Sequence, residues 1–414
     1  MVKLTETTEF ICVADDKGLA FHNLYSMKKI QILLFFIVLC ILKGYTQQRT
    51  IVFEAGKEGY ASYRIPAIVQ LKNGTILAFS EGRVDDAKDF GNVDIVYKTS
   101  QDHGKTWSRL RVAVDNGNKQ AGNIAPVLDK LDPEYQDGRL FLFYNTGNNH
   151  EGAVREGNGI REVWYITSLD HGMTWSKPIN ITLQVHQPNA PSFNKSYQFP
   201  ADWRAYANTP GQGFQFVTGP YKGRIYIAAN HSSGAPLPQG MDYQAHAYYS
   251  DDHGKTFKLS ATIPFKGGNE SMAAQISPTE VYMNSRNQQG NVKRRIVSYS
   301  SDGGMHWDTT YYDNKLPDPV NQGATISRYL KKGKFLLAVC NAADTLRRDN
   351  LTLRLSKDKG KTWYFNKVVA KAPKNYKGAY SAYCDMIFLD KKNMGILYEF
   401  DRYNYIVFQH VAIK

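Results

Sequence analysis

A motif of eight residues occurs five times along the chain and limits the possible folds more than any other feature of the sequence. Its consensus is Ser-x-Asp-x-Gly-x-Thr-Trp, with small departures in the third and fourth copies. The Asp can accept hydrogen bonds from turn amides, the Gly can adopt a positive φ, and the aromatic ring can pack beneath the turn. Each copy therefore predicts a tight hairpin turn. The copies begin at Ser100, Ser168, Ser250, Ser300 and Ser356.

The spacing of these turns predicts how they are arranged. Successive copies lie between 50 and 82 residues apart, and β-rich stretches precede most of them. Repeats that hold several strands each are typical of propeller blades, and roughly 60 residues per blade gives six blades over residues 49–414. The sequence thus predicts an all-β, six-bladed β-propeller with an insertion near residues 181–215. Residues 50–53 and 405–411 are expected to pair and to close the ring.

The composition supports strands and argues against a nucleic-acid partner. Aromatic residues make up 13% of the chain and glycine occurs 33 times, which favours strands and turns over helices. The formal net charge of +13 can attract anionic partners. However, the Lys and Arg residues are scattered, and no stretch interleaves them with aromatic residues. We therefore expect no nucleic-acid partner.

The amino-terminal 48 residues carry the pattern of a leader. Two lysines follow Met27, and residues 30–42 are almost wholly apolar. This run is too short to span a bilayer but matches the apolar region of a secretory signal peptide. We expect residues 1–48 to be a leader that starts at Met27 and is cleaved between about residues 44 and 49; a buried strand or helix is the alternative. Residues 49–414 are then exported to the periplasm, the cell surface or the extracellular medium, without a transmembrane segment.

The cysteines indicate neither a disulfide framework nor a metal site. Of the four, Cys12 and Cys40 lie in the expected leader, so Cys340 and Cys384 remain in the mature chain. No Cys-x-x-Cys pair or Cys/His spacing is typical of zinc. We expect no metal and no cofactor, and the sequence leaves open whether Cys340 and Cys384 pair.

A second motif, the tetrapeptide Tyr-Arg-Ile-Pro at residues 63–66, follows the first expected strand. It resembles the Phe/Tyr-Arg-Ile-Pro signature of sialidases, and the five turn motifs resemble the Asp boxes (bacterial neuraminidase repeats) of that family. The resemblance continues in the same order from about residue 50 to residue 414. The chain is therefore similar to bacterial exo-sialidases, which implies a sialidase-like propeller as the catalytic domain over residues 49–414.

The resemblance also implies a substrate and a reaction. Sialidases (neuraminidases) are glycosidases that release terminal sialic acid, so the expected partners are sialylated glycans on glycoproteins, gangliosides and sialyl-oligosaccharides. Ganglioside catabolism is one expected role. The expected activity is that of a retaining exo-α-sialidase, without metal or cofactor.

The carboxylate of sialic acid requires a positively charged partner. Arginine suits it because the planar guanidinium makes paired, charge-assisted hydrogen bonds and keeps its proton. The family uses three converging arginines, and the matching motifs imply Arg64, Arg286 and Arg348. Arg347 directly precedes Arg348, which leaves Arg347 as an alternative for the third position.

The same carboxylate affects the choice of nucleophile. A carboxylate nucleophile would meet like-charge repulsion, and sialidases use a tyrosine instead. The segment Gly-Ala-Tyr-Ser at residues 378–381 resembles the family's Tyr-Ser motif, which implies Tyr380 as nucleophile. Glu270, sixteen residues before Arg286, matches the glutamate that activates the tyrosine. Together they imply a covalent intermediate linked through tyrosine.

A general acid must protonate the leaving oxygen. The loop at residues 81–91 resembles the one that bears the family's acid/base aspartate, and Asp89 stands at the matching position. Asp85 and Asp86 lie close by and are the alternatives.

Three further residues take supporting roles by resemblance. Arg83 and Asp129 match residues that contact the 4-hydroxyl of the sugar, and Glu399 matches a carboxylate that orients Arg64. Gln275 stands where many relatives have a second glutamate, which is a departure from the family pattern.

Two other classes of function remain open. A trans-sialidase, or an intramolecular trans-sialidase that releases an anhydro sugar, would use the same site with a different acceptor. A catalytically inactive propeller that binds sialoglycans would lack at least one of Tyr380, Glu270 and Asp89, and all three are present. Analysis of the released sugar separates the first group from a hydrolase.

Overall fold

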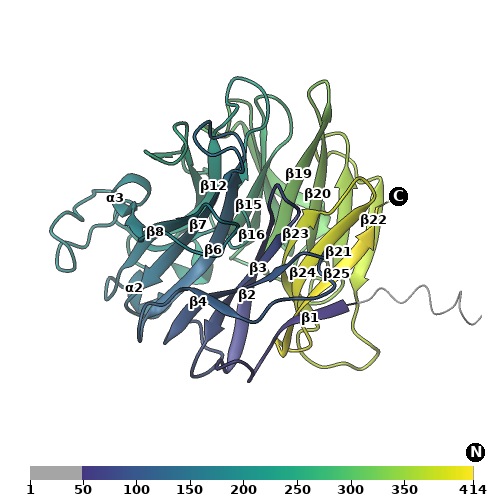
Figure 1. Ribbon diagram of the computed structural model, residues 1–414. Coiled ribbons are helices and arrows are strands. Elements are labelled where there is room, and N and C mark those ends of the chain that lie inside the picture. The colour runs from purple at the N-terminus through teal and green to yellow at the C-terminus, as the bar shows by residue number, and fades with distance from the viewer. Residues whose placement is uncertain (1–48, 414) are drawn as a thin grey trace, which may run out of the picture. The chain divides into compact units, whose positions relative to one another are not determined.

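The fold of the chain is all-β, as the sequence predicts (Figure 1). The structure is a computed structural model that describes residues 49–413. The expected leader lies outside the described residues. Between residues 49 and 413, no helix is long and apolar enough to cross a bilayer. Helical structure here consists of short segments: α2 (Glu151–Arg155), α3 (Thr182–Val185) and the 3-10 turn η1 (Pro238–Gly240).

Four of the five hydrogen-bonded sheets are separate antiparallel blades of four or five strands. One contains β23 (Ser381–Phe388), β24 (Asn393–Phe400), β25 (Tyr405–Ala412) and β1 (Arg49–Glu54). The next contains β10 (Trp203–Asn208), β11 (Phe214–Gln215), β12 (Ile225–Ser233), β13 (Tyr243–Ser250) and β14 (Lys258–Leu259). A third contains β15 (Gly268–Gln275), β16 (Val281–Asn287), β17 (Arg294–Ser300) and β18 (Thr309–Pro317). The fourth contains β19 (Gly323–Lys331), β20 (Lys334–Ala342), β21 (Leu351–Ser356) and β22 (Phe365–Ala370).

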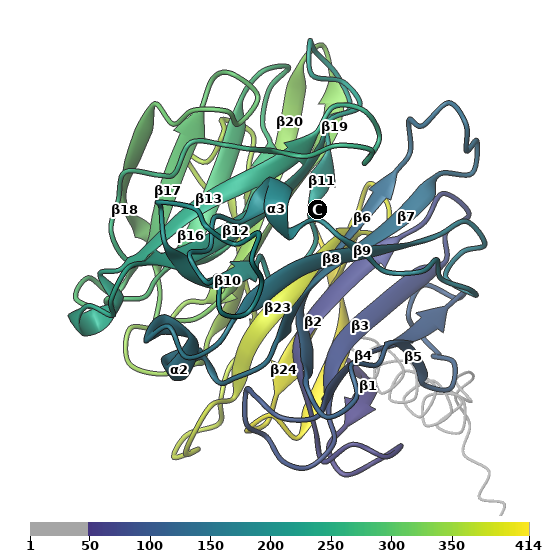
Figure 2. The same ribbon diagram turned by 90° about the vertical axis from the view of Figure 1, so that its left-hand side faces the viewer.

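The fifth sheet has eight strands, so the prediction of six blades is wrong. The reason is a parallel bridge between Val93 and Gln120, which joins two groups of strands into one hydrogen-bonded sheet (Figure 2). The repeat of the turn motif cannot reveal this bridge, because the bridge forms at the opposite end of the strands from the turns. The eight strands are β2 (Ser62–Gln70), β3 (Ile76–Arg83), β4 (Val93–Ser100), β5 (Arg111–Val114), β6 (Gln120–Asp129), β7 (Arg139–Gly147), β8 (Arg161–Ser168) and β9 (Ile179–Asn180).

The sheets are arranged as in a propeller, with their inner strands around a common centre. Strands β2, β6, β12, β15, β19 and β23 contact their neighbours in turn, and β23 contacts β2 again. The ring is closed as expected, because β1 pairs antiparallel with β25, with Thr50 opposite Phe408. The first and last described strands therefore stabilise one blade together.

The predicted hairpin turns form through a repeated set of hydrogen bonds. In the first copy, the Ser100 hydroxyl donates to Asp102 Oδ1 (2.8 Å), and the amide and hydroxyl of Thr106 donate to the same carboxylate (2.9 and 2.7 Å). These bonds hold the pKa of Asp102 well below its usual range. Gly104 has a φ of +84°, and a Cβ there would lie 2.2 Å from the Phe408 ring. Glycine is thus required both by the turn and by the packing against the next blade.

A buried carboxylate ties three segments together at the centre of the ring. Asp385 Oδ2 accepts hydrogen bonds from the amides of Ile68 (2.9 Å) and Gln212 (3.1 Å), and Oδ1 accepts one from the Gln212 side chain (3.2 Å). Burial raises the pKa of Asp385 to about 7. Cys384 and Cys340, whose pairing the sequence leaves open, are both buried free thiols.

Candidate active site

A cavity of about 710 Å³ lies where the inner strands β2, β6, β15 and β23 begin. Its volume is typical of small-molecule sites, which span roughly 300–1,000 Å³. All five sheets contribute to its lining, so residues far apart in the sequence meet there.

The three predicted arginines converge on this cavity from three different sheets. Arg64 lies on β2, Arg286 on β16, and Arg348 in the segment between β20 and β21. All three surround the side chain of Tyr383: the Cζ atoms of Arg64 and Arg348 lie 5.7 and 5.4 Å from the ring centroid, and Arg286 Nη1 donates to the hydroxyl (2.9 Å). The alternative, Arg347, does not line the cavity; its guanidinium donates to the carbonyl of Tyr376.

Glu399 holds Arg64 as the resemblance implies. The Nε of Arg64 donates to Glu399 Oε1 at 2.7 Å, and the amide of Ile65 donates to the same oxygen at 3.0 Å. Glu399 is fully buried. Burial lowers the pKa of Arg64, whereas the charge of Glu399 raises it. On balance, the pKa of Arg64 lies above its ordinary value. The ion pair therefore keeps Arg64 charged and in one orientation at the cavity wall.

Glu270 and Tyr383 form the polar centre of the cavity. The hydroxyl of Tyr383 donates to Glu270 Oε1 at 2.5 Å, and Arg286 Nη1 donates to Glu270 Oε2 at 2.7 Å. Burial, together with the negative charge of Glu270, raises the pKa of Tyr383. The phenol is therefore protonated, with its proton directed at a carboxylate that can accept it.

Tyr380, the predicted nucleophile, does not join this group. Its ring packs against Tyr376 and Phe400, both at centroid distances of 4.9 Å, and it does not line the cavity. Its amide bonds the carbonyl of Arg348 instead (2.9 Å). Tyr383 stands only three positions further along the chain, and sequence reasoning missed it because the Tyr-Ser motif drew attention to Tyr380.

The cavity-facing ends of the inner strands are irregular, and this irregularity aims the polar side chains. In β2, β6, β10, β15 and β23 the antiparallel register shifts within the segment next to the cavity. Such bulges re-aim side chains and are frequent beside active sites. Ile65 and Asn123 also have positive φ values of 58° and 52°, which are strained for residues other than glycine. The shifts fall between residues 64 and 67, 122 and 125, 203 and 206, 268 and 271, and 381 and 384.

Arg83 connects the predicted acid loop to the cavity wall. Its Nη1 lies 2.8 Å from Asp89 Oδ1, and its Nη2 lies 2.8 Å from Glu81 Oε2. Asp89 lines the cavity although its side chain is 87% exposed, whereas Asp85 and Asp86 do not line it. Sequence reasoning assigned no role to Glu81, whose pKa burial raises.

The structure does not bring Asp129 to the cavity, so its predicted contact with the sugar is corrected. Asp129 is the last residue of β6, whereas the first, Gln120, lines the cavity. Nine residues of strand separate them by about 30 Å. Asp129 Oδ2 lies 2.7 Å from His253 Nδ1. Gln275, the departure noted above, likewise lies at the far end of β15 and donates to the carbonyl of Thr218.

One group of potential metal ligands occurs in residues 49–413, and it lies away from the cavity. Asp129, Asp132 and His253 place their ligand atoms within 4.8 Å of one another. These atoms already have protein partners, because Asp129 bonds His253 and Asp132 Oδ2 bonds Arg139 at 2.7 Å. The group therefore serves to connect β6 to the turn at His253.

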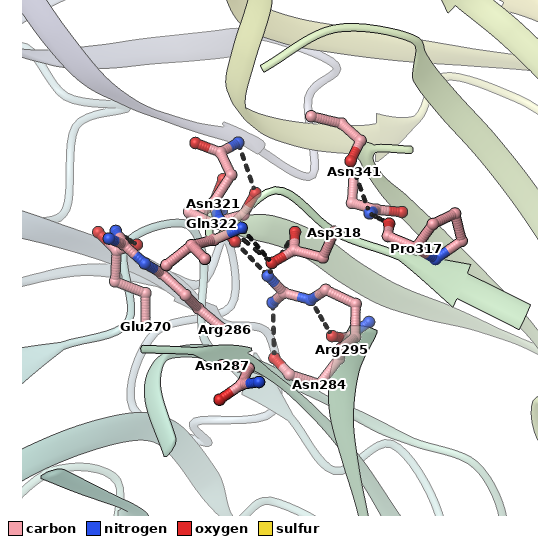
Figure 3. A network of polar contacts seen from close by, with 12 residues as sticks. Glu270, Asn284, Arg286, Asn287, Arg295, Pro317, Asp318, Asn321, Gln322 and Asn341 are labelled. Atoms are coloured by element: carbon pink, nitrogen blue, oxygen red, sulfur yellow. Dashed lines mark hydrogen bonds and ion pairs between the residues drawn. The ribbon is translucent and has the colours of Figure 1, made fainter. Parts of the chain in front are cut away.

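A buried polar network lies near Arg286 (Figure 3), and its Asp318 interacts electrostatically with that arginine. Arg295, which is fully buried, donates from Nε to Asn284 Oδ1 (2.6 Å), and its Nη1 lies 3.4 Å from Asp318 Oδ1. Asp318 in turn accepts the amide of Asn321 (3.1 Å). Burial raises the pKa of Asp318, while the positive charges of Arg295 and Arg286 oppose that rise. Sequence reasoning missed this network because its members are ordinary strand residues.

Further lining of the cavity comes from the eight-stranded sheet and the β10–β14 blade. Gln120, Arg161 and Asn230 line it together with the short helix α2. The hydroxyl of Tyr243 donates to Glu151 and thereby fixes α2 to the next blade. No sequence motif pointed to this part of the cavity.

Comparison with known proteins places the chain in a family. The family profile described as "BNR repeat-like domain" matches residues 74–392. The sialidase of Micromonospora viridifaciens is 29% identical over 375 residues, which cover 86% of this chain and 52% of that protein. The sialidase of Bacteroides fragilis (strain YCH46) is 27% identical, and the match covers 88% of this chain and 64% of that protein. The chain thus spans about half to two thirds of the length of these relatives.

Solved structures share the fold. A Hadza microbial sialidase has a TM-score of 0.71 and 23% identity, and the match covers 88% of this chain and 68% of the other. A leech intramolecular trans-sialidase has a TM-score of 0.67 and 17% identity, and the match covers 89% of this chain and 71% of the other. At these identities the likeness establishes the sialidase-like propeller arrangement alone. With its profile match over most of residues 49–413, the chain belongs to the family of BNR repeat-like domains.

Proposed function

We propose that this chain is an exo-α-sialidase, a glycoside hydrolase that removes terminal sialic acid from glycoproteins, gangliosides and oligosaccharides. One observation carries the proposal: Arg64, Arg286 and Arg348 converge from three sheets around the hydrogen-bonded pair of Tyr383 and Glu270. Three guanidinium groups suit a carboxylate, and a tyrosine beside a general base suits nucleophilic attack next to it. The curated relatives named above are sialidases, which supports the same conclusion.

The three arginines proposed to bind the carboxylate differ in their protein partners. Arg64 and Arg286 are oriented by Glu399 and Glu270, whereas Arg348 has no carboxylate partner among residues 49–413. Arg348 donates to the hydroxyl of Tyr403 at 3.1 Å and has further donors for a ligand. The clamp therefore has one uncompensated positive charge, and this charge matches the single carboxylate of the terminal sugar.

We assign the nucleophile to Tyr383 in place of Tyr380. In the first step the Tyr383 oxygen bonds to the anomeric carbon as the glycosidic bond breaks; its proton passes to Glu270, and Asp89 protonates the leaving oxygen. In the second step water attacks the anomeric carbon as the bond from that carbon to the Tyr383 oxygen breaks; the water gives a proton to Asp89, and Glu270 returns the proton to Tyr383. Two displacements retain the configuration, as in other retaining glycosidases.

The position of Asp89 fits an acid that must meet a departing glycan. Its loop is exposed, so the aglycone can leave towards solvent, and the 2.8 Å contact with Arg83 keeps the carboxyl at the cavity edge. Arg83 is itself held by the buried Glu81. Asp89 can therefore exchange protons with water between the two steps.

The decisive experiment is incubation with 3′- and 6′-sialyllactose, followed by identification of the released sugar. Free sialic acid, first formed as the α-anomer, is the expected product. Release of a 2,7-anhydro sugar would instead indicate intramolecular transfer, and transfer to added lactose would indicate a trans-sialidase. Absence of any release, with binding retained, would favour a sialoglycan-binding propeller and would overturn the proposal.

The covalent intermediate can be tested separately. A fluorinated sialosyl fluoride should label the wild-type protein at the peptide that contains Tyr383. Peptide mapping by mass spectrometry would locate the label. A label on Glu270, or on Tyr380, would contradict the assignment.

A further inference from the structure

Arg161 is a buried arginine of the cavity wall that has no acidic partner within ion-pair distance in residues 49–413. It is 6% exposed. The one hydrogen bond that its side chain makes to residues in this range runs from Nη1 to the side-chain oxygen of Gln120. By contrast, Arg64, Arg83 and Arg286 in the same cavity each pair with a carboxylate. The Nε and Nη2 donors of Arg161 therefore remain for a group inside the cavity.

The sheet is built to bring this guanidinium to the cavity. Gln120, Gly147 and Arg161 stand side by side on β6, β7 and β8, with Gly147 in the middle. A Cβ at Gly147 would lie 1.9 Å from Arg161 Nη1 and 2.8 Å from Cζ. The missing side chain thus lets Arg161 reach across one strand to Gln120. Because Gly147 does not have a positive φ, the turn chemistry of the backbone does not explain this glycine.

Among residues 49–413, no carboxylate pairs directly with the charge of Arg161. Burial lowers its pKa even though Glu151, Glu81 and Asp89 are near enough to raise it. Each of these acids is already engaged: Glu81 and Asp89 contact Arg83, and Glu151 accepts a hydrogen bond from a tyrosine. A buried charge without a direct partner is destabilising. A ligand that supplies the missing charge would recover part of that cost.

We propose that Arg161 and Gln120 form a binding site for a second oxyanion, a carboxylate or a sulfate ester, on the glycan held by the three arginines. This inference rests on the proposed function. The guanidinium offers a planar pair of donors that matches an oxyanion. The oxygen of Gln120 accepts a hydrogen bond from Arg161, and the side-chain NH2 of Gln120 is a further donor for a ligand. A site rich in donors favours a group rich in acceptors.

The distribution of direct ion pairs within the cavity is the observation that bears on a second anion. Of the five arginines that line it, Arg348 and Arg161 are the two without a carboxylate partner among the described residues. A terminal sialic acid with a single carboxylate compensates Arg348. A glycan with two anionic groups compensates both, so dianionic substrates are expected to be preferred.

The test compares three substrates on four proteins. The substrates are 3′-sialyllactose, its analogue with a sulfate ester on the sialic acid, and a lactoside with an α2-8-linked disialyl unit. The proteins are wild type, Arg161→Met, Gly147→Ala and Arg111→Met; Arg111 lies on β5 of the same sheet but outside the cavity. Gly147→Ala retains the charge of Arg161 but removes the space that its guanidinium occupies.

Wild type should show a higher kcat/KM for at least one dianionic substrate than for 3′-sialyllactose. Arg161→Met and Gly147→Ala should lower that ratio about tenfold or more, since charged hydrogen bonds are involved, while Arg111→Met should leave it unchanged. The dianionic substrate whose kcat/KM falls towards that of 3′-sialyllactose in these two variants identifies the bound oxyanion as sulfate or carboxylate. An unchanged ratio, or an equal fall for all three substrates, would overturn the inference.

A binding measurement separates this inference from the proposed function. Isothermal titration calorimetry of the sulfated and disialyl glycans against Tyr383→Phe, with and without Arg161→Met, needs no turnover. Tighter binding of a dianionic glycan that requires Arg161 would support the second site even if the wild-type protein released no sugar. Equal affinity for monoanionic and dianionic glycans would contradict it even in an active sialidase.

Discussion

The hydroxyl of Tyr383 donates a hydrogen bond of 2.5 Å to Glu270 Oε1, although 113 residues separate them in the sequence. Tyr383 lies on β23 and Glu270 on β15, and the two strands belong to different blades. Arg286 contacts both groups, so the phenol, the carboxylate and the guanidinium form one connected unit. The chemistry proposed for this protein depends on that unit more than on any other contact.

Tyr383→Phe should abolish most of the sialidase activity while leaving the fold intact. The change removes the oxygen that attacks the anomeric carbon but keeps the ring between the arginines. Steady-state kinetics with 3′-sialyllactose, together with a thermal melt, would check both statements. Tyr380→Phe is the matched control and should retain wild-type turnover, since its ring packs outside the cavity. The reverse pattern would restore Tyr380 as the nucleophile.

Arg348→Ala should lower kcat/KM by an amount equivalent to about 2–5 kcal/mol of transition-state stabilisation. Arg348 is the member of the clamp without a carboxylate partner among the described residues, so its charge is available to the substrate. Arg347→Ala should have little effect, because Arg347 lies outside the cavity and contacts the carbonyl of Tyr376. Comparable losses in the two variants would argue against the geometry described here.

Arg295→Met should raise KM and destabilise the protein. The substitution leaves Asp318 as an uncompensated buried charge, which costs about 3–5 kcal/mol, and this charge then acts on the nearby Arg286. The double variant Arg295→Met/Asp318→Asn should recover stability but not KM, if the network positions Arg286. Chemical denaturation and steady-state kinetics would measure the two effects. A KM that recovers with stability would mean that the network is purely structural.

Asp385 should make the stability of the protein fall as pH rises from about 4 to about 7. Its folded-state pKa is about 7, above the ordinary value of 3.8, because burial disfavours the charged form. Between those values the folded state holds a proton that the unfolded state lacks, so the free energy of unfolding decreases by about 1.4 kcal/mol per pH unit. The difference in free energy of unfolding between wild type and Asp385→Asn should therefore shrink from pH 5 to pH 7.5. A constant difference across that range would contradict the effect.

Export is expected to remove the leader. Mature protein from the native host should begin between about residues 44 and 49, because the apolar run at residues 30–42 has the length of the apolar region of a signal peptide. Amino-terminal sequencing would check this. Recovery of mature protein with the residues before Met27 still present would exclude both the leader and the expected start.

Much of this protein follows from local sequence chemistry. The turn motif specifies its own hydrogen bonds, since the Ser, Asp, Gly and Thr that make the turn at residues 100–106 are contiguous. For this reason the all-β class and the hairpin turns could be predicted. The arginines Arg64, Arg286 and Arg348 could be named because motifs surround them, although only the ring of sheets brings them together.

Other features depend on where strands end and how they meet in space. Tyr383 lies on β23 and lines the cavity, whereas Tyr380 precedes the strand and packs against Tyr376 and Phe400. Asp129 lies at the end of β6 away from the cavity, because the strand is ten residues long and its first residue lines the cavity. The bridge between Val93 and Gln120, which joins eight strands, and the reach of Arg161 over Gly147 are contacts between strands distant in sequence. Local motifs specify turns and residue types, whereas strand register and side-chain direction are decided when the sheets pack, because only then do the hydrogen-bond partners of each strand become defined.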